Sequence, residues 1–144
     1  MLLGEYEHTI DDKNRLTLPA KFRQAFEGGI VVTRGLDGCV YAWTPDAFGE
    51  YRDSQLATLP PLSQQSRRMN RHFFSGASEQ TPDKQGRVSI PPALLAHAKL
   101  GRDVVVAGVN DHLEIWDRAA WQRELAEVEG SAEDVAERLA AQGS

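Results

Sequence analysis

Polar and apolar residues alternate in two short segments of the chain, and each segment predicts a strand with one buried face. Residues 15–18 read Arg-Leu-Thr-Leu and residues 87–90 read Arg-Val-Ser-Ile, which is the period of two that a half-buried strand produces. A proline follows each segment, where it suits the first turn of a short helix. Residues 30–33 and 104–106 are β-branched runs that predict further strands. The chain is therefore expected to be rich in short strands, with short helices between them.

This pattern occurs twice. Residues 11–20 align with residues 83–92 at an offset of 72, and both read Asp, three residues, Arg, apolar, Thr or Ser, apolar, Pro. The segments that end in Trp43 and Trp116 align at an offset of 73. Each copy predicts about four short strands around one short helix. A unit of roughly 45 residues buries too little surface to be stable alone, so the repeat predicts an intramolecular pseudo-dimer with a shared core.

Helical patterns join the two copies and follow the second. Residues 45–59 and 63–74 are expected to be helices separated at Pro60-Pro61, and Asp117 is expected to cap a helix that Gly130-Ser131 ends. The predicted division is residues 1–50 for the first repeat, 51–75 for a helical connector, 76–128 for the second repeat and 129–144 for an acidic C-terminal tail.

The net charge of −5 does not by itself favour DNA as a partner. Residues 111–144 hold nine acidic and three basic residues, whereas residues 1–110 hold twelve acidic and thirteen basic residues. Because a binding surface acts through its local field, the overall acidity does not exclude DNA. A single cysteine, Cys39, rules out an intrachain disulfide. Without a signal-peptide pattern or a long apolar run, the protein is expected to be cytoplasmic, with no membrane partner.

Three motifs in order resemble the MraZ family. They are Gly4-Glu5-Tyr6 followed by residues 11–23 (DDKNRLTLPAKFR), residues 71–77 (RHFFSGA) and residues 83–87 (DKQGR), and the resemblance covers about residues 1–128. It implies an α+β fold of two tandem SpoVT-AbrB domains of the swapped-hairpin type, which form a pseudo-dimeric barrel with short flanking helices. One departure is Asn14, where the family usually has Gly; Asn tolerates a left-handed backbone, so the turn is expected to survive.

The same resemblance implies a function. MraZ proteins are bacterial transcriptional regulators that assemble into rings and bind short repeated DNA boxes upstream of the division and cell-wall gene cluster. We accordingly expect a nucleoid-associated repressor that binds double-stranded DNA with short tandem repeats as a homo-oligomer of more than four subunits.

Six residues are candidates for contact with DNA. Arg15 and Arg87 would project from the starts of the two alternating strands, because the fork of an arginine can grip two guanine acceptors or a phosphate. The other four candidates are Lys13, Asn14 and Lys84, on the turns before these strands, and Lys21, on the first helix. A local Asp–Arg pair that pins each turn is the structural alternative, and it is compatible with DNA contact. We expect the second copy to be partly structural.

A second basic cluster has an open role. Arg67, Arg68 and Arg71, with His72 beside them, form the densest basic group in the chain. On a helix, residues 67 and 71 share one face and residues 68 and 72 share the next. Phosphate binding, salt bridges to neighbouring subunits and simple solvation are all compatible with this pattern.

No catalytic, cofactor or metal motif is recognisable. The four histidines are isolated in sequence from one another and from the single cysteine, which does not fit metal-ligand spacing. We therefore expect no enzymatic activity and no cofactor. The alternative function is a structural ring-forming assembly protein that acts through protein partners, with Leu2, Leu3, Phe73 and Phe74 at its interfaces. A gel shift at low salt separates the two hypotheses.

Overall fold

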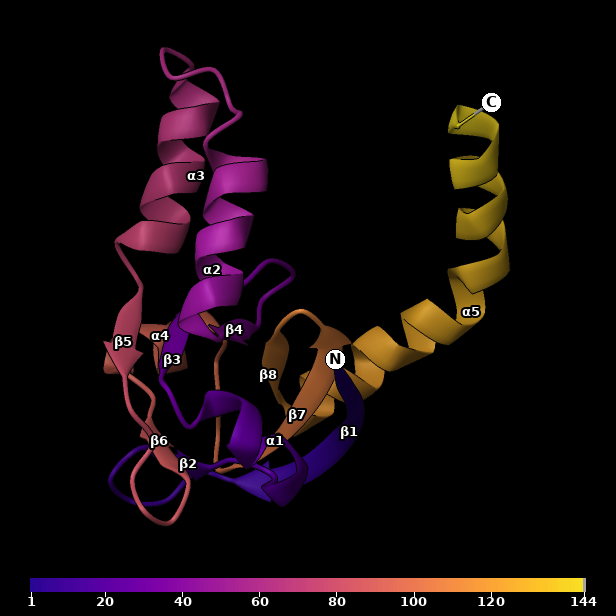
Figure 1. The fold of residues 1–144 in the computed structure, drawn as a ribbon. Coiled ribbons are helices and arrows are strands. Elements are labelled where there is room, and N and C mark those ends of the chain that lie inside the picture. Colours follow the sequence, from indigo (N-terminus) through magenta and orange to yellow (C-terminus); the bar gives the residue numbers. More distant parts are fainter. Residues whose placement is uncertain (144) are drawn as a thin grey trace.

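The computed structural model describes residues 1–143; residue 144, the end of the predicted tail, lies outside this range. Eight strands and the helices between them follow the repeat, with four strands in each copy as predicted (Figure 1). The elements are β1 Leu2–Thr9, β2 Arg15–Thr17, α1 Ala20–Arg23, η1 Gln24–Phe26, β3 Ile30–Arg34, β4 Val40–Trp43, α2 Pro45–Tyr51, η2 Arg52–Leu56, α3 Gln64–Phe74, β5 Ser78–Gln80, β6 Arg87–Ser89, α4 Pro92–His97, β7 Asp103–Asn110, β8 Leu113–Asp117 and α5 Arg118–Gln142.

The strands of the two copies are interleaved in space. A six-stranded sheet has the order β1-β7-β8-β4-β3-β5, and β2 pairs with β6 in a separate two-stranded sheet. Strand β1 of the first copy pairs with β7 of the second, β4 pairs with β8, and β3 pairs with β5, all antiparallel. Most strand pairs thus join the two copies, as the pseudo-dimer prediction requires.

The prediction of a barrel is wrong, because the six-stranded sheet is not closed. Its edge strands are β1 and β5. The strands that could have bridged them, β2 and β6, have three residues each and are followed by Pro19 and Pro91 after one further residue. Proline cannot donate to a ladder, which keeps these strands short. They pair with each other, and a single bridge between Ile10 and Leu16 links them to the end of β1.

Both faces of the central sheet are covered. In β3, Ile30 and Val32 point into a core that includes Leu16, Phe26 and Leu94, among others from β2, η1 and α4. The intervening Val31 belongs to a second cluster, beneath the helical arm that α2, η2 and α3 form. This two-sided burial explains why residues 30–32 read as a continuous apolar run rather than an alternating one.

Two glycines at matched positions of the repeat lack room for a side chain. A Cβ on Gly108 would lie 2.6 Å from the carbonyl carbon of Leu2 and the backbone nitrogen of Leu3, and one on Gly35 would lie 2.5 Å from the Tyr41 ring. Backbone atoms of a paired strand yield less easily than the end of a side chain. The close approach of β1 to β7 therefore requires glycine at residue 108.

We expect Gly108→Ala to lower the free energy of unfolding by about 1–3 kcal/mol, the usual cost of overpacking. Urea unfolding followed by circular dichroism measures this. Gly28→Ala is the matched control, because nothing lies within 4 Å of its Cβ position, and it should stay within about 0.5 kcal/mol of wild type. Equal stability of the two variants would show that β1 is not held against β7 in solution.

A partly buried histidine, His112, packs on aromatic residues of β4. The His112 ring stacks on Trp43 at 4.8 Å and lies 4.4 Å from the Tyr41 ring, and its two nitrogens lie 2.7 Å from Asp111 Oδ1 and 3.1 Å from Glu114 Oε2. Burial opposes protonation of this ring, but the hydrogen bonds and charges of Glu114 and Asp111 outweigh it and raise the pKa of His112 above 6.5.

A group whose pKa is raised on folding stabilises the folded state fully below its unfolded pKa, and this contribution disappears as the pH rises through the folded pKa. His112→Gln should therefore remove the part of the stability loss that occurs as the pH rises above 6.5. Urea midpoints measured from about pH 5 to about pH 9 for both proteins test this. His8 has the opposite effect on the pH dependence of stability, because burial lowers its pKa. An unchanged pH profile in His112→Gln would contradict the raised pKa.

Helix α5 corrects the prediction of a break. Asp117 caps the helix as predicted, accepting a hydrogen bond from the Ala120 backbone at 3.2 Å. Gly130-Ser131 does not end it, and α5 continues to Gln142, changing direction part of the way along (Figure 1). Within the helix the Ser131 hydroxyl donates to the Glu127 carbonyl at 2.6 Å, an interaction that often bends helices without breaking them. No helix within residues 1–143 is both long and apolar enough to cross a membrane.

Candidate nucleic-acid interface

The two alternating segments form one two-stranded ribbon. In the antiparallel pairing of β2 and β6, Arg15 lies opposite Ser89, Leu16 opposite Val88, and Thr17 opposite Arg87. The middle pair is buried in the core. Because side chains alternate along a strand, the remaining four residues share the outer face. The two arginines, which are 72 residues apart in sequence, are therefore diagonal neighbours on one polar surface.

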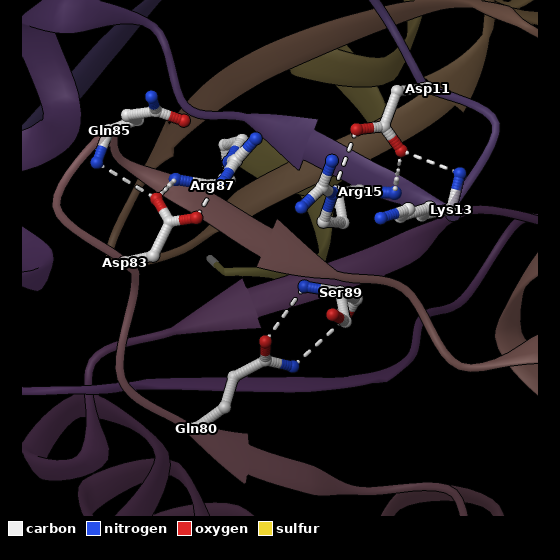
Figure 2. Close-up of polar contacts among 8 residues, drawn as sticks. All are labelled: Asp11, Lys13, Arg15, Gln80, Asp83, Gln85, Arg87 and Ser89. Carbon is white, nitrogen blue, oxygen red and sulfur yellow. Dashed lines mark hydrogen bonds and ion pairs between the residues drawn. The ribbon is translucent and has the colours of Figure 1, made fainter.

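In the first copy a carboxylate holds the arginine from the preceding turn (Figure 2). One oxygen of Asp11 accepts the backbone N–H groups of Lys13 and Arg15, both at 2.9 Å, and the other accepts Arg15 Nε at 2.8 Å. The turn places Asn14 at φ 60°. Asn14 thus adopts the left-handed backbone that the sequence predicted it would tolerate.

The second copy repeats this geometry (Figure 2). Asp83 accepts the backbone N–H groups of Gln85 and Arg87 at 2.9 Å each, and Arg87 Nε at 2.6 Å. Gly86 takes the place of Asn14, with φ 76°. The predicted pairing of Asp and Arg is thus confirmed in both copies. We name these two arrangements, Asp11 with Arg15 and Asp83 with Arg87, the arginine clamps.

Each clamp orients its arginine without covering it. The arginine side chains are 28% and 30% exposed for Arg15 and Arg87, and within residues 1–143 neither guanidinium makes a hydrogen bond through its Nη atoms. The hydrogen bond from the arginine backbone N–H is the main cause that lowers the pKa of Asp11 and of Asp83, and the arginine side chain adds to it. The two carboxylates therefore stay ionised, and the outer edges of both guanidiniums are available to a ligand.

The turns of the two copies also hold the ribbon together. The Leu18 backbone donates to the Gly86 carbonyl and the Ile90 backbone donates to the Asn14 carbonyl, each at 2.8 Å. Each turn therefore accepts a hydrogen bond from the strand of the other copy. These hydrogen bonds fix the spacing between the two arginines, and they form only when both copies are folded together.

Lys21 belongs to the first copy in sequence, but its helix, α1, lies beside the turn of the second copy. Lys13, Lys84 and Lys21 are exposed. Arg23 of α1 donates to the Leu18 carbonyl at 3.0 Å, and a Cβ on Gly86 would come within 2.8 Å of the Arg23 side chain. The turn of residues 83–86 therefore has basic residues from both copies around it, whereas Asp12 stands beside Lys13 in the other turn.

Gln80, at the end of β5 in the six-stranded sheet, contacts the ribbon, and no sequence pattern predicts this contact. Its side-chain amide donates to the Ser89 carbonyl and accepts the Ser89 N–H, both at 2.8 Å (Figure 2). Gln80 thereby closes the outer edge of β6 beside the clamp of Arg87. The repeat could not reveal it, because the aligned residue in the first copy is His8.

Two of the histidines are adjacent in the fold although isolated in sequence. The Nε2 atoms of His72 in α3 and His97 in α4 lie 2.9 Å and 3.3 Å from the carbonyl oxygen of Gly35. They tie the helical arm and the second copy to the turn between β3 and β4. Among residues 1–143 no three His, Cys, Asp or Glu side chains gather in a group that could hold a metal ion.

A family model and full-length relatives of this chain carry the same family name. A family model described as "MraZ protein, putative antitoxin-like" matches twice, over residues 1–72 and 73–142. The chain is 45% identical over 140 residues to the transcriptional regulator MraZ of Roseiflexus sp. (strain RS-1), covering 97% of each protein. It is 47% identical over 131 residues to the transcriptional regulator MraZ of Arthrobacter sp. (strain FB24), covering 91% of this chain and 92% of the relative. It is 45% identical to the protein of that name from Clavibacter michiganensis subsp. michiganensis (strain NCPPB 382), covering 96% of each.

Proposed function

We propose, from the premise that this chain belongs to the MraZ family of transcriptional regulators, that it regulates transcription by binding double-stranded DNA through the β2–β6 ribbon. One observation carries the proposal. The ribbon presents two arginines on one face, each oriented by its own carboxylate and each with its outer edge free.

The ribbon has the architecture and the chemistry that suit the major groove. A two-stranded ribbon fits this groove, and an arginine there can bind both acceptors of a guanine. A clamped arginine has less side-chain freedom to lose on binding, which favours a specific contact. We assign base reading to Arg15 and Arg87, and contact with the phosphates to Lys13, Asn14, Lys84 and Lys21. Lysine suits a phosphate as a compact point charge.

The proposed DNA site is a set of short tandem boxes upstream of the division and cell-wall gene cluster. A homo-oligomeric ring of more than four subunits would place several ribbons on one DNA segment, and the linked contacts would multiply the affinity of each. Bound there, the nucleoid-associated protein would act as a repressor. This part of the proposal rests on the family and on the repeated clamps.

Footprinting on DNA upstream of the protein's own gene tests the proposal. We expect protection of tandem boxes spaced by about one helical turn, which would place them on one DNA face. The affinity should fall steeply as the salt concentration rises from about 50 to about 200 mM, because binding to phosphates releases counterions. An absence of binding at low salt would refute DNA recognition and favour the assembly protein that acts through protein partners.

The lysines have a separate signature. Lys13→Gln with Lys84→Gln should weaken binding to all sequences alike and reduce the slope of log affinity against log salt by about 0.9 for each phosphate that is no longer neutralised. The ranking of matched over mismatched boxes should stay. Arg52→Gln removes one exposed charge from the helical arm, and this control should leave the slope unchanged. An unchanged slope in the double variant would remove the phosphate contacts from the proposal.

A further inference from the structure

The distal part of α5, residues 127–142, exposes a stripe of apolar residues. Val128, Val135 and Leu139 are 50%, 42% and 61% exposed, and none of the residues of α5 is buried. With Leu125 and Ala132 they follow one another at alternating spacings of three and four, which places all five on one side of the helix. Such a stripe is typical of a helix that packs against another.

Within residues 1–143, this helical segment stands away from the body of its own chain (Figure 1). The main contacts of α5 with the rest of the molecule are with β7 and β8, near its start. Figure 1 shows the C-terminal half standing clear of the sheet and of the helical arm. An isolated helix of this length is marginal in water, and Gly130 weakens it further relative to alanine. A partner surface is therefore needed to stabilise it.

The charge of the segment defines the chemistry of that partner. The exposed acidic residues of residues 127–142 are Glu127, Glu129, Glu133, Asp134 and Glu137, against one basic residue, Arg138. The matching surface should combine exposed apolar side chains with a cluster of positive charges. DNA does not meet this description because it is itself an anion.

Helix α3 in the helical arm has both features. It contains Arg67, Arg68 and Arg71, all exposed, and no acidic residue. Within residues 1–143 none of the three forms an ion pair. Beside them lie two exposed apolar residues, Leu62 at 90% and Phe74 at 39%. The basic cluster whose role the sequence left open thus lies on a helix with uncovered apolar neighbours.

The two surfaces cannot meet within one chain in this arrangement. Both the arm and the distal part of α5 project from the side of the sheet away from the ribbon, and they stand apart from each other (Figure 1). Eleven residues in α3 span roughly 16 Å and residues 127–142 span roughly 24 Å, so the distal part of α5 is long enough to cover the whole of α3. The complementary surfaces of one molecule are therefore free for two different neighbours.

We infer that the distal part of α5 docks on α3 of a second copy of this chain. The contact joins unlike surfaces, and in a ring of more than two copies each copy gives its helix to one neighbour and receives a helix from the other. Such head-to-tail contacts close into rings when the rotation between copies allows it. The inference deepens the proposed function, because it names the contact that would hold the ring together while the ribbons stay free for DNA.

Two charge-reversed proteins test this contact. The first carries Arg67→Glu, Arg68→Glu and Arg71→Glu, and the second carries Glu133→Lys, Asp134→Lys and Glu137→Lys. We expect each alone to lose the higher oligomer in light scattering at low micromolar concentration. Mixed together, they should assemble again, because the reversed arm of the first meets the reversed helix of the second and their unchanged surfaces match as well. Glu27→Lys with Glu79→Lys, elsewhere on the surface, is the control and should assemble like wild type.

The possible failures are distinguishable. Oligomers that persist in both reversed proteins would overturn the docking contact and leave the ring itself standing. Dissociation of each variant without recovery on mixing would show that α5 and α3 bind other surfaces, and it would also overturn the pairing. A monomeric wild type would remove the ring from the proposed function, whereas DNA binding is measured separately by footprinting.

Folding of the variants needs its own control. All substituted positions are exposed, so circular dichroism of the sheet should match wild type. Truncation after residue 126 serves as a second variant, since it removes the docking helix without adding charge. We expect it to be folded and to have a lower oligomer size. A truncated protein that assembles fully would contradict the inference.

Discussion

Arg15→Ala is expected to abolish specific binding to tandem boxes while the oligomer size and the melting temperature stay close to wild type. A bidentate contact between an arginine and a guanine contributes about 1–3 kcal/mol of discrimination. In an assembly that engages several boxes at once, this loss occurs in every subunit, and multivalent affinity depends on simultaneous engagement. Fluorescence anisotropy with a single box measures the loss of affinity per contact, and the same measurement with tandem boxes measures the loss of multivalent affinity.

The structure changes what we expect of Arg87. The sequence predicts that the second copy is partly structural, which would make Arg87→Ala the milder of the two substitutions. The two clamps have the same hydrogen bonds and almost the same arginine exposure, which removes the reason for that ranking. We now expect Arg87→Ala to weaken binding about as much as Arg15→Ala.

Conservative variants distinguish a role of Arg15 in base recognition from a role in folding. Arg15→Lys keeps the charge but lacks the planar fork, so we expect it to keep nonspecific binding and lose the preference for matched boxes. Asp11→Asn leaves Arg15 in place but weakens the clamp, and its effect should lie between those of wild type and Arg15→Ala. If Arg15→Ala binds tandem boxes as tightly as wild type, the ribbon is not the reading surface. If it unfolds or dissociates, the clamp is a structural pair alone.

The second large effect is expected when the chain is divided. Residues 1–60 and 61–144, produced separately, should each fail to give a folded monomer. The physical reason is the strand pairing: β1 pairs with β7, β2 with β6, β3 with β5 and β4 with β8, so either half alone is without four strand partners and half of the shared core. A unit of this size with its core exposed is not expected to be stable.

Mixing the two halves should restore the fold. The division falls at Pro60-Pro61, in an exposed turn between η2 and α3, so it removes no strand pair. We expect a one-to-one complex with the circular dichroism of the intact protein, measured after refolding the halves together. Each half alone should be unfolded or paired with a second copy of itself. A folded monomer from either half would contradict the pseudo-dimer.

Part of this molecule could be predicted from local sequence. The clamp depends on residues four apart and on one left-handed position, so its hydrogen bonds need no partner from elsewhere in the chain, and the repeated Asp-x-x-x-Arg pattern predicted both copies. Asp117 and Ser63 likewise cap their helices from adjacent residues. The family was also evident from motifs, since each is a short run of sequence, and the full-length relatives confirm it.

Contacts between distant residues were outside the reach of local patterns. Three such contacts join different elements of the fold, and no sequence pattern links their residues. Gln80 pairs with Ser89, His72 and His97 share the Gly35 carbonyl, and the Arg23 side chain lies over Gly86. The open sheet was missed for a related reason. Whether strands close into a barrel depends on how far short strands can extend, and prolines near the ends of β2 and β6 limited them.

Gly130-Ser131 shows where a local signal was overridden. Glycine and serine together favour the end of a helix, yet the helix-forming residues on both sides carry α5 through, and the Ser131 hydroxyl is satisfied within the helix by the Glu127 carbonyl. Hydrophobic periodicity and the repeat thus determined the strands, the helices, the clamps and the pseudo-dimer, because these depend on spacing along the chain. Only the tertiary structure decided that the two arginines share one face and that the distal part of α5 stands clear of the helical arm (Figure 1), because both depend on which distant surfaces the fold brings together.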